Sequence, residues 1–176
     1  MNFKEILNLY AEYNKHANSE MARILGTLPE SRLHEAAATY YKSIAGLINH
    51  ALQSTVNLLK RAADGGFLPD LILPAVTSFP QAPPGGTIFK NLAEYAALRT
   101  KADDMMAAVC KAAPADDLDK SFTFTGRDNT PRTITYGGNL LSLYTHEIHH
   151  RGGVATILDG WGVENDWSSL MRFLMK

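Results

Sequence analysis

Two histidines, His146 and His150, are separated by four positions in a segment whose apolar residues recur at helical spacing. Side chains at positions i and i+4 of an α-helix lie on the same face, one turn apart, so the two imidazoles can reach a common point. Neutral imidazole is the commonest metal-ligating side chain. The spacing therefore indicates a divalent-metal site, although a pair of buried, hydrogen-bonded histidines would give the same pattern.

The neighbouring histidine His149 is predicted to lie outside this pair. At 100° per residue, His146 and His150 fall on the apolar side of the helix with Leu143 and Val154. His149 falls on its small and polar side. We therefore expect His149 at the surface or beside the ligands.

A third candidate ligand, His50, lies in another predicted helix. Its neighbours within about 40° on that helix are polar, and they include Ser54, Asn57 and Arg61. Three histidines would leave a coordination position open, which distinguishes catalytic from closed structural metal sites. For the remaining histidines, His16 and His34, we expect surface or packing roles.

Four segments with helical apolar spacing must position these histidines: residues 3–25, 38–63, 88–113 and 138–159. Thr87 is the expected N-cap of the third. Five prolines between Phe67 and Gly86 predict a crossover packed on the surface. Alternation in residues 121–125 and 132–136 predicts a hairpin, and residues 167–173 a short helix. The predicted fold is all-α: a four-helix bundle with a long crossover, a small β-hairpin before the last long helix and a short C-terminal helix, in a single domain over residues 1–176.

Composition excludes several classes of protein. The chain has 176 residues, 45% of them hydrophobic and 20% charged, with a formal net charge of -1, which is ordinary for a globular protein and unlike a membrane or disordered one. It has no basic run that would favour nucleic-acid binding. Cys110 is the only cysteine, so an intrachain disulfide and a thiolate metal cluster are excluded. Without a secretory signal at the start, we expect a cytoplasmic protein.

Three motifs together resemble the DinB-like family. They are Tyr13 to Asn18 (YNKHAN), Ile48 to His50 (INH) and His146 to Gly152 (HEIHHRG), with Arg99 and Asp103 as further agreement. The resemblance implies a four-helix bundle, usually a homodimer, in which His50, His146 and His150 bind nickel, zinc or a similar divalent ion.

The reaction is less determined by this resemblance than the metal site. Some members of the family are thiol S-transferases that use bacillithiol, mycothiol or glutathione, and others have no assigned reaction. The chain also departs from the common pattern, with Thr55 where Asp is frequent, Leu58 where Trp is frequent and Gly153 where Gln is frequent. We expect these three positions to line or adjoin the pocket, where they would change which substrate fits.

Our functional hypothesis is a metal-dependent thiol S-transferase or hydrolase that acts on a small electrophile. The expected ion is Zn or Ni, with Fe, Mn and Cu also compatible, and a low-molecular-weight thiol is the expected co-substrate. We expect catalytic roles for Tyr13, Asn18 and Arg151, and substrate-binding roles for Asn14, Asn49 and Asn57. Structural alternatives stay open: Asn18 and Asn49 could join helices, and Arg151 could pair with Glu147.

Two other functions compete with this hypothesis. In the first, the protein is a non-enzymatic stress-response protein whose ion only locks the bundle. In the second, it binds DNA, which the near-neutral charge argues against. The expected partners are thus a small-molecule substrate and a second copy of the chain, without nucleic acid or membrane.

Overall fold

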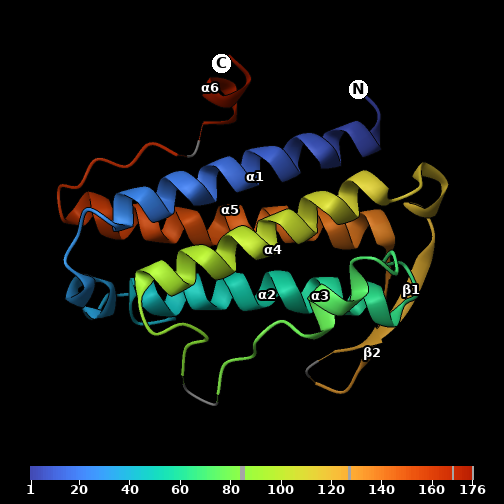
Figure 1. Ribbon diagram of the computed structural model, residues 1–176, viewed down its shortest axis with the longest axis horizontal. Helices are drawn as coiled ribbons and strands as arrows, with labels where there is room; N and C mark the ends of the chain where they lie inside the picture. Colours follow the sequence, from blue (N-terminus) through green and yellow to red (C-terminus); the bar gives the residue numbers. More distant parts are fainter. Residues whose placement is uncertain (84–85, 127, 168, 176) are drawn as a thin grey trace.

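Four long helices pack side by side in the computed structural model, which describes residues 1–83, 86–126, 128–167 and 169–175 (Figure 1). They are α1 (Phe3–Leu25), α2 (Ile44–Asp64), α4 (Leu92–Ala112) and α5 (Tyr136–Gly160). The helices α1 and α5 run in one direction and α2 and α4 in the other (Figure 1). The main contacts are between α1 and α4 and between α2 and α5, and α1–α5 and α2–α4 contacts close the bundle. The predicted fold class is confirmed.

Each long helix begins at a polar N-cap whose side chain accepts a hydrogen bond from a backbone N–H of the first turn. The caps are Asn2, Ser43, Asn91 and Thr135. Such a bond satisfies one of the donors that have no partner inside the helix. Two predicted starts are therefore wrong: α2 begins at Ile44 instead of residue 38, and α4 at Leu92 instead of residue 88.

The physical reasons for these two differences are local. Lys42 has a positive φ of 66°, which stops a helix from running through it into α2. Thr87, the expected cap of α4, uses its hydroxyl to donate to the Phe89 carbonyl (2.7 Å), and Asn91 caps the helix instead.

The connection from α2 to α4 is packed on the bundle, as its prolines predicted. It contains the short helix α3 (Leu73–Thr77), which has proline in its first turn. Val76, Phe79 and Phe89 from this segment are buried. A long connection is needed here because α2 and α4 run in the same direction (Figure 1).

A two-stranded antiparallel hairpin precedes α5 and covers the C-terminal end of α2. Its strands are β1 (Ser121–Thr125) and β2 (Pro131–Thr135), and Phe122 pairs with Ile134. Phe67, just after α2, contacts both Phe122 and Tyr136, with ring centroids 5.6 Å and 4.8 Å apart. The hairpin is thus fixed between the end of α2 and the start of α5.

The short C-terminal helix α6 (Leu170–Leu174) lies beside α1, on the outside of the bundle (Figure 1). Phe173 packs against Tyr13 and stacks on His16, with ring centroids 5.9 Å and 5.5 Å apart. Trp167 is buried. These aromatic residues therefore cap the bundle within one chain, and His16 has a packing role as expected.

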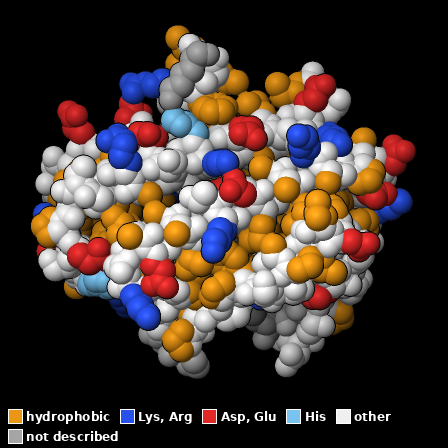
Figure 2. Space-filling view, viewed as in Figure 1, with side chains coloured by type: hydrophobic (Ala, Val, Ile, Leu, Met, Phe, Trp, Pro, Cys, Tyr) orange, Lys and Arg blue, Asp and Glu red, His pale blue; other side chains and the backbone are white. Residues whose placement is uncertain are grey.

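Charged side chains of both signs are distributed over the surface. Acidic and basic groups are interspersed on the face shown in Figure 2. That face therefore offers no broad area of one charge. Among the described residues, the helices lack any stretch that is both long and apolar enough to cross a bilayer.

Candidate metal centre

The three predicted ligands meet between α2 and α5. His146 Nε2 lies 3.2 Å from His50 Nε2 and 3.1 Å from His150 Nε2. The three side chains can place one ligand atom each within 4.8 Å of the other two. The antiparallel packing of α2 on α5 therefore brings together residues 96 positions apart in the sequence.

The donor set fits a divalent ion better than a hydrogen-bonded cluster. His146 Nε2 has one in-plane lone pair or one proton, and it meets two other ring nitrogens, so one of the two contacts is poorly satisfied without a cation. Two nitrogens bound to one ion at 2.0–2.1 Å are about 3.3–3.4 Å apart in tetrahedral geometry and about 2.8–3.0 Å apart in octahedral geometry. The observed separations of 3.2 Å and 3.1 Å lie between these values.

The environment of His150 keeps its imidazole neutral. Burial lowers the pKa of His150 to about 4, and the neighbouring His146, His50 and His149 add to the effect. A neutral ring has the lone pair that a metal needs. Within the described residues, the buried Nδ1 of His150 has no hydrogen-bond partner. His149 is exposed, as predicted from its helical face.

Tyr41 covers the histidines and was not predicted from the sequence. Its ring stacks on His50, with centroids 4.1 Å apart and planes 20° apart, and it meets the His150 ring edge-on at 5.4 Å. Because Tyr41 precedes α2 in an irregular segment, apolar periodicity could not place it. Only the turn before α2 brings the phenol ring over the cluster.

That turn depends on the small size of Gly46. A Cβ atom at residue 46 would lie only 2.1 Å from the Tyr41 carbonyl oxygen, which real structures do not tolerate. The backbone N–H of Gly46 also donates to the capping hydroxyl of Ser43 (3.1 Å). The close approach of the chain before α2 to its first turn therefore fixes the position of Tyr41.

An open cleft of about 600 Å³ adjoins His50 and His146. Its other lining residues are largely polar or charged: Ser54, Asn57, Leu58, Lys60, Arg61, Asp64 and Ser142. The Ser54 hydroxyl lies 3.3 Å from His50 Nε2. A larger cleft of about 770 Å³ near the end of α1 has no histidine, cysteine or aromatic residue in its lining. We therefore place the candidate site in the cleft beside the histidines.

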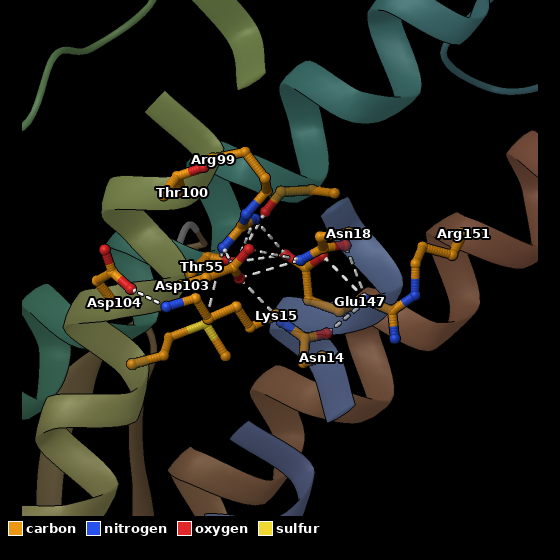
Figure 3. Close-up of polar contacts among 12 residues, drawn as sticks. Asn14, Lys15, Asn18, Thr55, Arg99, Thr100, Asp103, Asp104, Glu147 and Arg151 are labelled. Atoms are coloured by element: carbon orange, nitrogen blue, oxygen red, sulfur yellow. Dashed lines mark hydrogen bonds and ion pairs between the residues drawn. The ribbon is translucent and has the colours of Figure 1, made fainter. Parts of the chain in front are cut away.

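A buried polar network lies next to the histidines and joins all four long helices (Figure 3). Its centre is Glu147, which is 1% exposed and accepts hydrogen bonds from Arg99 Nη1 (2.9 Å) and Thr55 Oγ1. Arg99 also pairs with Asp103 at 2.9 Å, and Arg151 lies 3.8 Å from the second oxygen of Glu147. Two guanidinium groups and two carboxylates thus balance one another in the interior.

The side-chain amides of α1 complete this network. Asn14 and Asn18 donate to Asp103 Oδ1 at 3.1 Å and 3.0 Å, and their carbonyl oxygens accept from Arg151. Each amide therefore bridges a carboxylate of α4 and a guanidinium of α5, as Figure 3 shows. Because buried polar groups are costly unless partnered, these contacts fix how the helices pack.

The pKa values of the two network carboxylates shift in opposite directions. Burial alone would raise the pKa of Glu147, but the charges of Arg99 and Arg151 hold it below its ordinary value. Burial raises the pKa of Asp103 to about 6 against the opposing charge of Arg99. The contacts around Asp103, which accepts from two amides and pairs with Arg99, suit its charged form.

The structure separates the polar residues that the sequence had grouped around the ion. Asn57 lines the cleft beside the histidines. Asn14, Asn18 and Arg151 belong to the buried network. Asn49 holds the crossover, because its side chain accepts from the Ile88 N–H (2.9 Å) and donates to the Gly86 carbonyl (3.4 Å).

Tyr13 lies beside the network instead of the cleft, with its ring 5.8 Å from the Arg151 guanidinium. The pairing of Arg151 with Glu147, the structural alternative from the sequence, is present. A catalytic role thus stays a prediction for Tyr13, Asn18 and Arg151, and substrate binding stays a prediction for Asn14, Asn49 and Asn57.

The three residues that depart from the family pattern lie in different surroundings. Leu58 lines the cleft, whereas the Thr55 hydroxyl is buried against Glu147. A Cβ at Gly153 would contact only the Leu47 side chain, at 3.6 Å. Glu147 itself had a signal in the sequence: it is an acidic residue on a helix beside buried histidines. Its contact with Arg99 could not be predicted, because Arg99 is distant in the chain.

Comparison with known proteins identifies the family to which the chain is similar. The DinB family profile matches residues 1–175, which is nearly the whole chain. No curated protein sequence gives a significant match.

Proposed function

The chain belongs to the DinB family, and on this basis we propose that it is a metal-dependent enzyme that activates a thiol or water against a small electrophile. The ion would be held by His50, His146 and His150. The observation that carries the proposal is the convergence of three imidazole nitrogens beside an open, polar cleft. When bound, a divalent ion with an open position lowers the pKa of a water or thiol ligand.

The residues around the histidines have separate tasks in this proposal. Tyr41 covers the rings of His50 and His150 and excludes water from that side. Ser54 Oγ, 3.3 Å from His50 Nε2, can hold a polar atom of the substrate at the mouth of the cleft. Asn57, farther along the same wall, offers both a donor and an acceptor to orient the substrate.

An enzyme is favoured over a protein whose ion only locks the bundle. The buried network already joins the four helices without an ion, through Glu147, Asp103 and their partners. The histidines, in contrast, join only α2 and α5 and adjoin a cleft. A homodimer and a low-molecular-weight thiol co-substrate are parts of this proposal that rest on the family resemblance.

Metal binding is tested by titrating the metal-free protein with Zn²⁺, Ni²⁺ and Co²⁺ in a calorimeter and recording the Co²⁺ absorption spectrum. We expect one ion per chain. Mutation of a residue that only hydrogen-bonds to a metal ligand weakens metal affinity by about 10- to 100-fold. Removal of a ligand itself, in His150→Ala, should therefore weaken binding by more than about 100-fold. His149→Ala is the matched control, since His149 is exposed on the same helix.

Activity is tested with the metal-loaded protein, a panel of low-molecular-weight thiols and a haloarene electrophile, with ester substrates for hydrolysis. We expect turnover that chelation abolishes, that His150→Ala loses and that His149→Ala retains. Stoichiometric metal binding without turnover of any substrate, together with a large fall in melting temperature on chelation, would instead support the structural role. Equal metal affinity in the two variants would refute the assigned ligands.

A further inference from the structure

The cleft beside the histidines follows one stripe of α2 towards the hairpin. Its residues on this helix include His50, Ser54, Asn57, Arg61 and Asp64. At 100° per residue they fall within about 40° of His50, so they form a single row along the helix. The cleft is therefore elongated, with the histidines near one end and charged residues at the other.

Among the described residues that line the far end of the cleft, positive charges outnumber negative ones. Lys60 and Arg61 are half-buried, and Asp64 is exposed. The Arg61 guanidinium lies 4.4 Å from the centroid of the Phe124 ring, so strand β1 orients it. The two cations and one carboxylate of this described lining suit a singly charged anion. The planar guanidinium also matches the shape of a carboxylate.

The helix geometry sets the length of a ligand that would use both ends. His50 and Arg61 lie eleven positions apart in the sequence, which corresponds to about 16 Å along the helix axis. Helical side chains lean towards the N-terminus, and the long arginine side chain can shorten this span to about 10 Å. A ligand that reaches both ends therefore has a reacting group and an anion separated by about 10–16 Å.

We propose that Arg61 and Lys60 bind the carboxylate of an elongated substrate or co-substrate whose reacting group lies at the three histidines. This inference rests on the proposed function, since it uses the metal site as the reactive end. It assigns a substrate class that the histidines alone do not: flexible, singly anionic molecules with the carboxylate remote from the reacting atom.

The experiment measures binding to the zinc-loaded protein by calorimetry, without any need for turnover. The probe is suberic acid monohydroxamate, whose hydroxamate binds zinc and whose carboxylate can reach Arg61. Its uncharged partner is the corresponding monoamide of the same length. We expect the carboxylate probe to bind about five- to tenfold more tightly than the amide, as for a partly exposed charge-assisted contact. Succinic acid monohydroxamate, which is too short, should gain no such advantage over its amide.

The variant Arg61→Gln should remove most of the carboxylate advantage and leave the affinity of the amide probe unchanged. That unchanged affinity also shows that the variant is folded and loaded. Lys60→Gln, which keeps the contact between Arg61 and Phe124, should lower the advantage in part. The matched control is Arg172→Gln, an exposed arginine on α6, which should change neither probe.

Equal binding of the carboxylate and amide probes to the parent protein would overturn this inference and leave the metal site standing. The inference also fails if Arg172→Gln is as damaging as Arg61→Gln, because the effect would then be one of net charge. If neither hydroxamate binds the zinc-loaded protein, the open coordination position is wrong. The proposed function and this inference then both fail.

Discussion

Replacement of Glu147 by Gln would leave two buried guanidinium groups facing one remaining carboxylate. Arg99 and Arg151 both lie against Glu147, and the side chains of all three are almost completely buried. Asp103 would then be the only anion of the network. The substitution keeps the size of the side chain, so its effect reports the charge and not a cavity.

The expected cost follows from the burial of the charges. Removal of one partner of a buried ion pair destabilises a protein by about 3–5 kcal/mol. Because Gln retains an oxygen that can accept from Arg99 and Thr55, we expect the lower end, about 3 kcal/mol. For a chain of this size each kcal/mol shifts the melting temperature by about 2–4 °C, so Glu147→Gln should melt about 6–12 °C below the parent.

The assay is calorimetric and urea unfolding of metal-free protein at neutral pH, with Glu20→Gln as the matched control. Glu20 pairs with Arg23 on the surface of α1, and such pairs contribute less than about 1 kcal/mol. Arg99 and Arg151 lower the pKa of Glu147 in the folded state. The parent therefore loses the stabilisation from the Glu147 charge as pH falls below 4.5, the ordinary pKa of a glutamate. The difference between parent and Glu147→Gln should therefore shrink in acid. If Glu147→Gln and Glu20→Gln had the same melting temperature at neutral pH, the charge of Glu147 would not stabilise the fold.

Three further predictions concern other parts of the molecule. Gly46→Ala should destabilise the fold by about 1–3 kcal/mol through the clash with the Tyr41 carbonyl, and it should alter the Co²⁺ spectrum. The control is Gly152→Ala, because a Cβ at residue 152 meets no atom within 4 Å. Equal stability of the two variants would contradict the close approach. Burial raises the pKa of Cys110 to about 11, so at pH 8 a disulfide reagent should label it only at the rate of unfolding, and fast labelling of the native protein would disprove its burial. Folding lowers the pKa of His150 from 6.5 to about 4, so protonation of this side chain favours the unfolded state. The stability that the metal-free protein owes to neutral His150 is complete above pH 6.5 and is lost as pH falls through 4. In His150→Ala the acid unfolding midpoint should therefore move to lower pH, and an unchanged midpoint would count against this assignment.

Much of the site could be predicted because it is encoded by local periodicity. The i, i+4 spacing of His146 and His150 holds in any helix, and the apolar stripe of α5 determined that both face inwards while His149 faces out. The polar row that follows His50 on α2 likewise predicted a polar wall beside it, and that wall lines the cleft. Helix starts were less accurate, since Ser43 and Asn91 act as caps through hydrogen bonds that several nearby polar residues could have made.

The sequence by itself determined the bundle, the three histidines and the absence of any thiolate cluster, since residue types and short spacings suffice for these. Tertiary structure alone decided three other things: that Tyr41 covers His50, that Glu147 meets Arg99, and that Asn14 and Asn18 serve a buried network instead of the cleft. The physical reason is that each of these contacts joins different elements. Its geometry depends on a turn before α2 or on the mutual packing of α1, α4 and α5, which no periodicity within a single helix records.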